Sequence, residues 1–119
     1  MLKIAVFASG RGSNFQSIID SIKSGDVAAE VKLLISDNQE AGALKRAEHE
    51  DIENLYIDPA RFETKADYEE ELVGLLEKAG VELVILAGYM RILSPLFVKH
   101  FKNQIINIHP SLLPAFKGL

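Results

Sequence analysis

Two polar side chains near the end of the sequence, Asn107 and His109, could do chemistry together. They lie two positions apart at the end of the apolar stretch 104–108. If that stretch is a β-strand, both side chains project from the same face. An amide N–H and a protonated imidazole can stabilise the oxyanion that forms when an amine attacks a carbonyl, and the imidazole can carry the proton that the amine loses. The pair favours acyl transfer without a serine or cysteine nucleophile. The alternative is a hydrogen-bonded asparagine and a structural histidine at a strand end.

A glycine-rich segment near the start of the chain is typical of a phosphate-binding loop. It reads Ser9-Gly10-Arg11-Gly12-Ser13-Asn14 and follows an apolar run. Its glycines let backbone amides approach an anion, and the segment ends where a helix would offer free N–H groups. It lacks the third glycine of the dinucleotide fingerprint, and no acidic residue ends the second expected strand as a ribose partner would, although Asp37 is close. A tight strand-to-helix turn with a serine or asparagine cap is the alternative.

A third segment, Gly88-Tyr89-Met90-Arg91-Ile92-Leu93, places one arginine among apolar residues directly after the most apolar run of the sequence. This composition is consistent with the lining of an apolar ligand pocket. The alternative is a core-forming connection in which Arg91 reaches solvent or a structural carboxylate.

Five apolar runs and four helical patterns alternate along the chain and must position these segments. Strands are expected over 3–8, 31–35, 54–57, 81–87 and 104–108, and helices over 15–22, 41–47, 68–79 and 96–101. Asp37 and Asn38 are expected to cap the second helix, and Ser94 followed by Pro95 the fourth. The alternation predicts an α/β fold with a mostly parallel sheet, helices on both faces and the strand 81–87 at its centre. Ligands bind beyond the carboxyl ends of such strands, where the three polar segments should converge.

Composition limits the remaining classes. A chain of 119 residues suits a single domain, and a net charge of −4 disfavours nucleic acid as a partner. There is no cysteine, which excludes thiolate metal sites and cysteine nucleophiles. The apolar runs are shorter than the roughly 20 residues that span a bilayer, and residues 1–3 lead directly into a strand. We therefore expect a cytoplasmic protein without a membrane partner.

The pair Asn107 and His109 belongs to a longer block, Asn107-Ile108-His109-Pro110-Ser111-Leu112-Leu113-Pro114. In their order and spacing, this block and the other two segments resemble the phosphoribosylglycinamide formyltransferase family, and the resemblance extends along the whole chain. The last block is shared in outline by other folate-dependent formyltransferases and hydrolases, whereas the early Gly-Ser-Asn loop is more particular to the purine enzyme. The resemblance implies a Rossmann-like formyltransferase fold. It also implies transfer of a formyl group from 10-formyltetrahydrofolate to the amino group of glycinamide ribonucleotide in purine biosynthesis, with no metal.

The resemblance also assigns roles to individual residues. Gly12, Ser13 and Asn14 would bind the ribonucleotide. Asn107 would contact the formyl group, and His109 would act as general acid and proton carrier. The folate site would include Lys65, at a position where the family often has arginine, together with Asn107 and the stretch Met90, Arg91, Ile92 and Leu93.

The family also has a catalytic aspartate on a later loop, and residues 110–119 contain no acidic side chain. We therefore expect residues 1–119 to be the N-terminal portion of a single formyltransferase domain, with little or no formyl transfer by this chain alone. A formyltetrahydrofolate hydrolase, a methionyl-tRNA formyltransferase and a non-catalytic nucleotide-binding module are the alternatives. A homodimer remains open, and Leu113-Pro114 is the expected position of a cis peptide bond.

Overall fold

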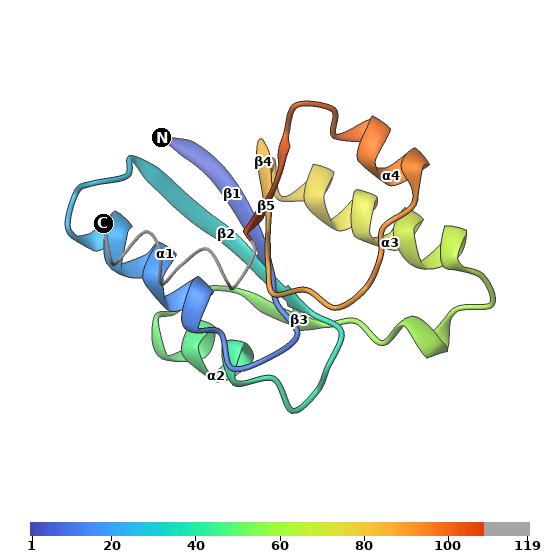
Figure 1. The fold of residues 1–119 in the computed structure, drawn as a ribbon, viewed down its shortest axis with the longest axis horizontal. Coiled ribbons are helices and arrows are strands. Elements are labelled where there is room, and N and C mark those ends of the chain that lie inside the picture. The colour runs from blue at the N-terminus through green and yellow to red at the C-terminus, as the bar shows by residue number, and fades with distance from the viewer. Residues whose placement is uncertain (109–119) are drawn as a thin grey trace.

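The computed structural model describes residues 1–108, which form one parallel sheet between two layers of helices (Figure 1). The strands are β1 (Leu2–Phe7), β2 (Ala29–Ser36), β3 (Asn54–Tyr56), β4 (Leu83–Ala87) and β5 (Ile105–Ile108). Their order across the sheet is β3-β2-β1-β4-β5, and all four pairings are parallel. The expected α/β class is confirmed.

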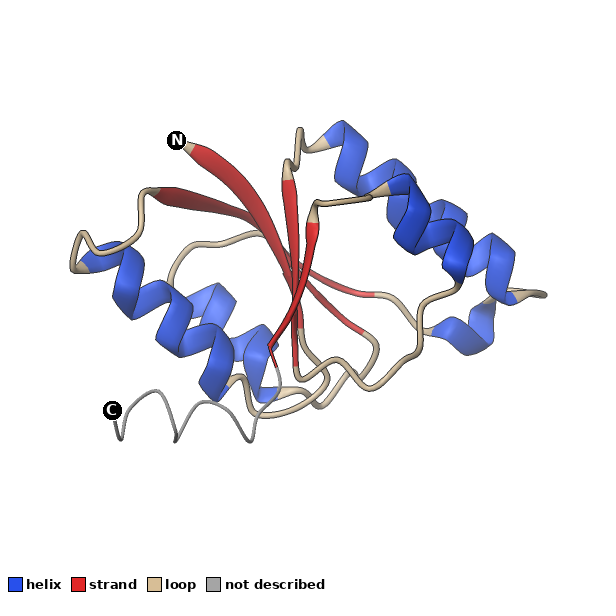
Figure 2. Ribbon diagram, turned by 45° about the horizontal axis from the view of Figure 1, so that its top comes forward, coloured by secondary structure: helices blue, strands red, loops and turns tan. Residues whose placement is uncertain are grey.

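The helices are α1 (Ser13–Lys23), α2 (Gly42–His49), α3 (Lys65–Lys78) and α4 (Pro95–His100), with a 3-10 turn η1 (Pro59–Arg61). Figure 2 shows α1 and α2 on one side of the sheet and α3 and α4 on the other. Alternate residues of β1 divide the core accordingly, because successive side chains of a strand point to opposite faces. Ile4 and Val6 pack with Phe15 under α1, whereas Ala5 and Phe7 pack with Leu72 under α3.

Two expectations about β4 need correction. It begins at Leu83 rather than Val81, because the Val81 amide donates to the Leu76 carbonyl oxygen at 3.0 Å and so belongs to the turn that closes α3. It is also not the central strand. β1 lies in the middle of the sheet, and β4 lies between β1 and β5.

The start of α2 also differs from the prediction. Its N-cap is Ala41, which makes no side-chain capping bond, because Asp37 and Asn38 are engaged elsewhere. The Asn38 side-chain amide donates to the Ser9 carbonyl oxygen at 3.1 Å. The predicted cap of α4 is confirmed, since the Ser94 hydroxyl accepts the Phe97 amide at 3.3 Å.

The strand order reverses direction between β1 and β4. From β1 the chain proceeds outward through β2 and β3 on one side, and then returns to β4 and β5 on the other. The connections that leave β1 and β4 therefore diverge, which is where open α/β sheets bind ligands. The two connections touch at their bases, where the Ser9 amide donates to the Gly88 carbonyl oxygen at 3.2 Å. Within residues 1–108, no helix has the length and apolar character needed to cross a membrane.

Candidate functional site at the carboxyl edge of the sheet

The glycine-rich segment forms the turn from β1 into α1, as predicted. Gly12 is the N-cap residue, with φ of 82°, and its carbonyl oxygen accepts the Gln16 amide at 2.8 Å. The serine or asparagine cap of the alternative interpretation is not seen, since α1 has no side-chain capping bond within the described chain. No acidic residue lies in the first turn. The amides of that turn and the positive end of the helix dipole are therefore suited to an anionic ligand.

The loop rests on the start of α2, which the sequence alone did not indicate. The Ala43 amide donates to the Gly10 carbonyl oxygen at 3.1 Å, and Arg46 Nε donates to the Arg11 carbonyl oxygen at 2.7 Å. A Cβ atom at Gly12 would lie 2.7 Å from Ala43 Cα. Glycine at position 12 is thus required both by its left-handed backbone and by this close approach.

A hydrogen-bonded cluster joins the ends of β1, β2 and β4 at the carboxyl edge of the sheet. The Ser9 hydroxyl donates to Asp37 Oδ1 at 2.6 Å and accepts the Met90 amide at 2.8 Å. Asp37 Oδ2 accepts Arg91 Nε at 2.9 Å. The Asp37 side chain is 6% exposed and that of Arg91 is 53% exposed. The structure thus favours the alternative interpretation of Arg91, a contact with a structural carboxylate.

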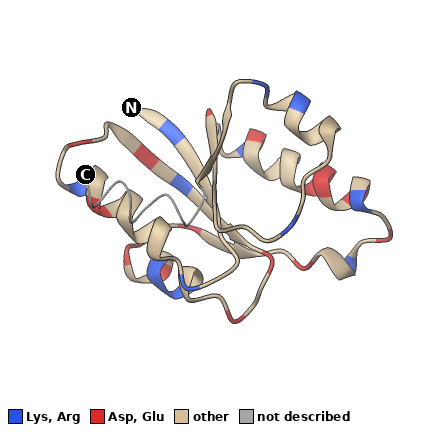
Figure 3. Cartoon of the chain, in the orientation of Figure 1, with Lys and Arg blue, Asp and Glu red and all other residues tan. Residues whose placement is uncertain are grey.

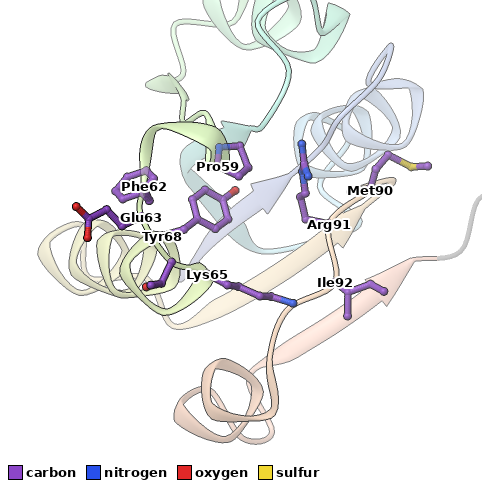
Figure 4. A pocket seen from close by; sticks show the side chains of 9 residues that line it. Pro59, Phe62, Glu63, Lys65, Tyr68, Met90, Arg91 and Ile92 are labelled. Carbon is purple, nitrogen blue, oxygen red and sulfur yellow. The ribbon is translucent and has the colours of Figure 1, made fainter.

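Beside this cluster is a cavity of about 420 Å³ between the β4–α4 connection and the start of α3 (Figure 4). It brings together four of the predicted folate residues, Lys65, Met90, Arg91 and Ile92. The other two predicted folate residues, Leu93 and Asn107, are not in the lining, and Leu93 packs against the core under α3 and α4. The rest of the lining consists of Pro59, Phe62, Glu63, Thr64 and Tyr68.

Electrostatics in this region is governed by individual side chains. Lys and Arg are distributed over both helical layers and interspersed with Asp and Glu (Figure 3).

Behind the cavity, the hydroxyl groups of Tyr68 and Tyr89 are hydrogen-bonded to each other. Burial raises the pKa of both phenols above their ordinary value, so they are neutral at physiological pH.

β5 carries Asn107 opposite Leu86 of β4, close to the carboxyl edge. Ile105 packs against the core under α3 and α4, so Asn107, two residues later, lies on the same face of the sheet as the 88–93 connection. Its side chain is exposed. His109 and Leu113-Pro114 lie outside the described residues, so the predicted shared face of Asn107 and His109 stays a prediction.

On the opposite face, Asn14 is buried and lines a second cavity of about 330 Å³ with Ile85 and Ile108. The start of α1 therefore lies near the end of β5. Among residues 1–108, no group of three or more His, Asp or Glu side chains is arranged to hold a metal ion.

Comparison with known proteins identifies the family to which the chain is similar. The sequence pattern of the family described as "Formyl transferase" matches residues 2–119. The chain is 43% identical over 119 residues to phosphoribosylglycinamide formyltransferase of Bacillus subtilis, covering 100% of this chain and 61% of that protein. It is 39% identical over 118 residues to the Escherichia coli enzyme of the same name, covering 99% of this chain and 56% of that one.

A solved structure agrees with these relatives. Glycinamide ribonucleotide transformylase 1 of Geobacillus kaustophilus superposes with a TM-score of 0.89 at 42% identity, covering 98% of this chain and 62% of that one. This likeness confirms the Rossmann-like formyltransferase fold. The chain spans less than two thirds of the length of each of these relatives. With its whole length matched and its fold shared, the chain belongs to the formyl transferase family.

Proposed function

We propose that this chain contributes to the transfer of a formyl group from 10-formyltetrahydrofolate to the amino group of glycinamide ribonucleotide in purine biosynthesis. The supporting observation is that the glycine-rich loop, the cavity beside the 88–93 connection and Asn107 lie at one edge of the sheet. The names of the similar proteins support formyl transfer to the ribonucleotide. We further propose that residues 1–119 form the N-terminal portion of a single formyltransferase domain.

The ribonucleotide phosphate would bind at the start of α1. Gly12, Ser13 and Asn14 supply the backbone amides of the first turn, and the helix dipole adds to the attraction. Because Asn14 lines the same cavity as Ile108 of β5, a ligand held at this turn by its phosphate can extend toward the end of β5.

The folate would occupy the cavity between α3 and the β4–α4 connection. Met90 and Ile92 are largely exposed and offer apolar surface to a ring system. In Figure 4 the Lys65 side chain extends toward the Ile92 segment, where its ammonium group suits the carboxylates of a folate tail. Because the Arg91 guanidinium is paired with Asp37, we propose that this residue contributes mainly through its backbone. Leu93 would support the segment from the core.

In the chemical step, the ribonucleotide amine would attack the formyl carbon while the carbonyl electron pair moves onto oxygen. The Asn107 amide N–H would stabilise that oxyanion. As the tetrahedral intermediate collapses, the bond from carbon to the folate nitrogen breaks, and that nitrogen receives a proton. His109 would carry the proton from the attacking amine to the leaving nitrogen. The proposed step uses no metal, because the Asn107 amide N–H meets the negative charge on oxygen and His109 takes the proton from the positively charged attacking nitrogen.

The remaining partners follow from this proposal. Both ligands are small molecules, so neither nucleic acid nor a membrane takes part, and the cytoplasm is the compartment that we propose. A homodimer is also proposed, and sedimentation velocity at two protein concentrations tests it.

Calorimetric titration of the 119-residue chain with glycinamide ribonucleotide and, separately, with tetrahydrofolate tests the proposed ligands. We expect both to bind. A non-catalytic nucleotide-binding module would bind the first alone, and binding of neither would contradict the proposal. Single-turnover reactions with an isotopically labelled formyl donor then compare Asn107→Ala with Gln104→Ala, an exposed amide at the other end of the β5 region. Only the first change should reduce label transfer.

A further inference from the structure

The β4–α4 connection is an exposed segment that its own side chains fix only in part. Tyr89 and Leu93 pack against the core under α3 and α4, but Met90 and Ile92 between them are 78% and 83% exposed. The backbone between Gly88 and Ser94 therefore depends on hydrogen bonds for its shape. Two buried carboxylates, one near each end of the segment, supply or organise those bonds.

The first carboxylate is Asp37, at the end of β2. It accepts the Ser9 hydroxyl proton, which turns the oxygen lone pairs of that hydroxyl toward the Met90 amide at 2.8 Å. The same carboxylate accepts Arg91 Nε at 2.9 Å. Two consecutive residues of the segment are thus held by one carboxylate, one through Ser9 and the other directly.

The second carboxylate is Glu69, on α3. It is a buried residue, 6% exposed, and its two oxygens accept the Ser94 backbone amide at 2.7 Å and the Ser94 hydroxyl. The Ser94 hydroxyl in turn accepts the Phe97 amide and caps α4. Glu69 therefore fixes both the end of the connection and the start of the helix that follows it.

Burial of a carboxylate is unfavourable unless hydrogen bonds compensate for the lost water. Apolar side chains could have filled either position. Instead, Asp37 and Glu69 both accept hydrogen bonds that hold the same exposed segment, Glu69 directly and Asp37 both directly and through Ser9. We propose that Asp37 and Glu69 are positioning residues that hold the 90–93 backbone in its ligand-binding shape, acting through Ser9, Arg91 and Ser94. The identity of the ligand, a folate, rests on the function proposed above.

The consequence is preorganisation of the segment. A segment already ordered in the free protein loses less conformational entropy when it binds a ligand. If the anchor at either end is removed, the ordering cost of one or two residues is moved to the binding step, which weakens the affinity for the ligand by about tenfold.

The test combines amide hydrogen exchange with calorimetry on the 119-residue chain and its variants. In Ser9→Ala, the Met90 amide should exchange at least about tenfold faster, because it loses its acceptor. In Glu69→Ala, the Ser94 amide should do the same. The Val84 amide, which donates to the Gln104 carbonyl oxygen at 2.7 Å inside the sheet, serves as the reference for global opening.

Two further variants separate positioning from a general structural role. Glu69→Gln can still accept the Ser94 amide and donate to its hydroxyl, so it should restore slow exchange and wild-type affinity for tetrahydrofolate. Ser24→Ala removes an exposed serine–aspartate pair, Ser24 with Asp26, and should change neither quantity. In Ser9→Ala and Glu69→Ala, affinity for glycinamide ribonucleotide should change less than affinity for tetrahydrofolate.

Unchanged exchange at Met90 in Ser9→Ala, or equal acceleration of the Val84 amide, overturns the inference. The same is true if Ser9→Ala binds tetrahydrofolate as well as wild type does. If wild-type protein binds no tetrahydrofolate, the proposed function fails, while selective acceleration at Met90 and Ser94 still supports the two anchors. The two failures are therefore distinguishable.

Discussion

Replacement of Gly12 by alanine tests the packing of the glycine-rich loop on α2. Gly12 has φ of 82°, and an added Cβ would lie 2.7 Å from Ala43 Cα and 2.8 Å from Ala43 Cβ. The left-handed backbone costs an L-residue about 1–2 kcal/mol. Overpacking against a backbone atom adds about 1–3 kcal/mol. We expect Gly12→Ala to lower the free energy of unfolding by about 2–5 kcal/mol in total.

Gly25→Ala is the matched control, since Gly25 has φ of 87° but no atom within 4 Å of the added Cβ. It retains the backbone cost and lacks the contact. The difference between the variants in urea unfolding isolates the contact at about 1–3 kcal/mol. Gly12→Ala should also weaken ribonucleotide binding in calorimetry, whereas Gly25→Ala should not. Equal stability of the two variants would refute the close approach of the loop to α2.

Three further predictions concern the cavity, the buried phenols and the chemical step. Lys65→Met should weaken tetrahydrofolate binding by about 3–10-fold at low salt and less at high salt, whereas Lys65→Arg should preserve it. Equal affinity of the two variants in calorimetry would contradict a role for the charge. Burial raises the pKa of Tyr89 above its ordinary value near 10, so the folded protein keeps this proton to higher pH than the unfolded chain. The contribution of Tyr89 to stability is complete below pH about 10 and is lost above it. Between pH 8 and 11, the free energy of unfolding measured in urea should therefore fall less in Tyr89→Phe than in the wild-type protein. Formyl transfer by the 119-residue chain should be slow, because no carboxylate between His109 and Leu119 can orient the imidazole. Steady-state turnover close to that of the Bacillus subtilis relative would be incompatible with this prediction.

The succession of elements was predictable because strands buried on both faces appear as continuous apolar runs. β1 and β4 were recognised for this reason, and the helices were recognised from apolar residues at spacings of three and four. Boundaries were less predictable where a residue serves two elements. Val81 has the composition of a strand residue, but its amide closes α3. The order of strands across the sheet depends on tertiary packing, which is why β4 was wrongly placed at the centre.

Of the candidate site, the local segments were predictable and their mutual contacts were not. The glycines of the first loop and the apolar stretch around Arg91 could be recognised by type. The partnership of Ser9 with Asp37 joins residues 28 positions apart, and no local pattern encodes it. Glu69 did leave a signal, because it lies three and seven positions before Leu72 and Leu76 and so faces the core side of α3. Because Glu69 is the first of three consecutive glutamates, its position on the core side of the helix was not distinguished from the exposed positions of the other two.

The place of β1 at the middle of the sheet has a consequence for how the chain acquires its structure. Among the strands of the sheet, β1 is synthesised first, and it pairs with β4, whose last residue, Ala87, follows Phe7 by about 80 positions. At a synthesis rate of about 5–20 residues per second, one edge of β1 waits roughly 4–16 s for its neighbour. During that interval the Ile4-Ala5-Val6-Phe7 stretch presents unpaired backbone and apolar side chains. An unpaired apolar strand edge can pair with another chain, and in this topology that exposure lasts longer than in a hairpin, whose second strand follows within a few residues.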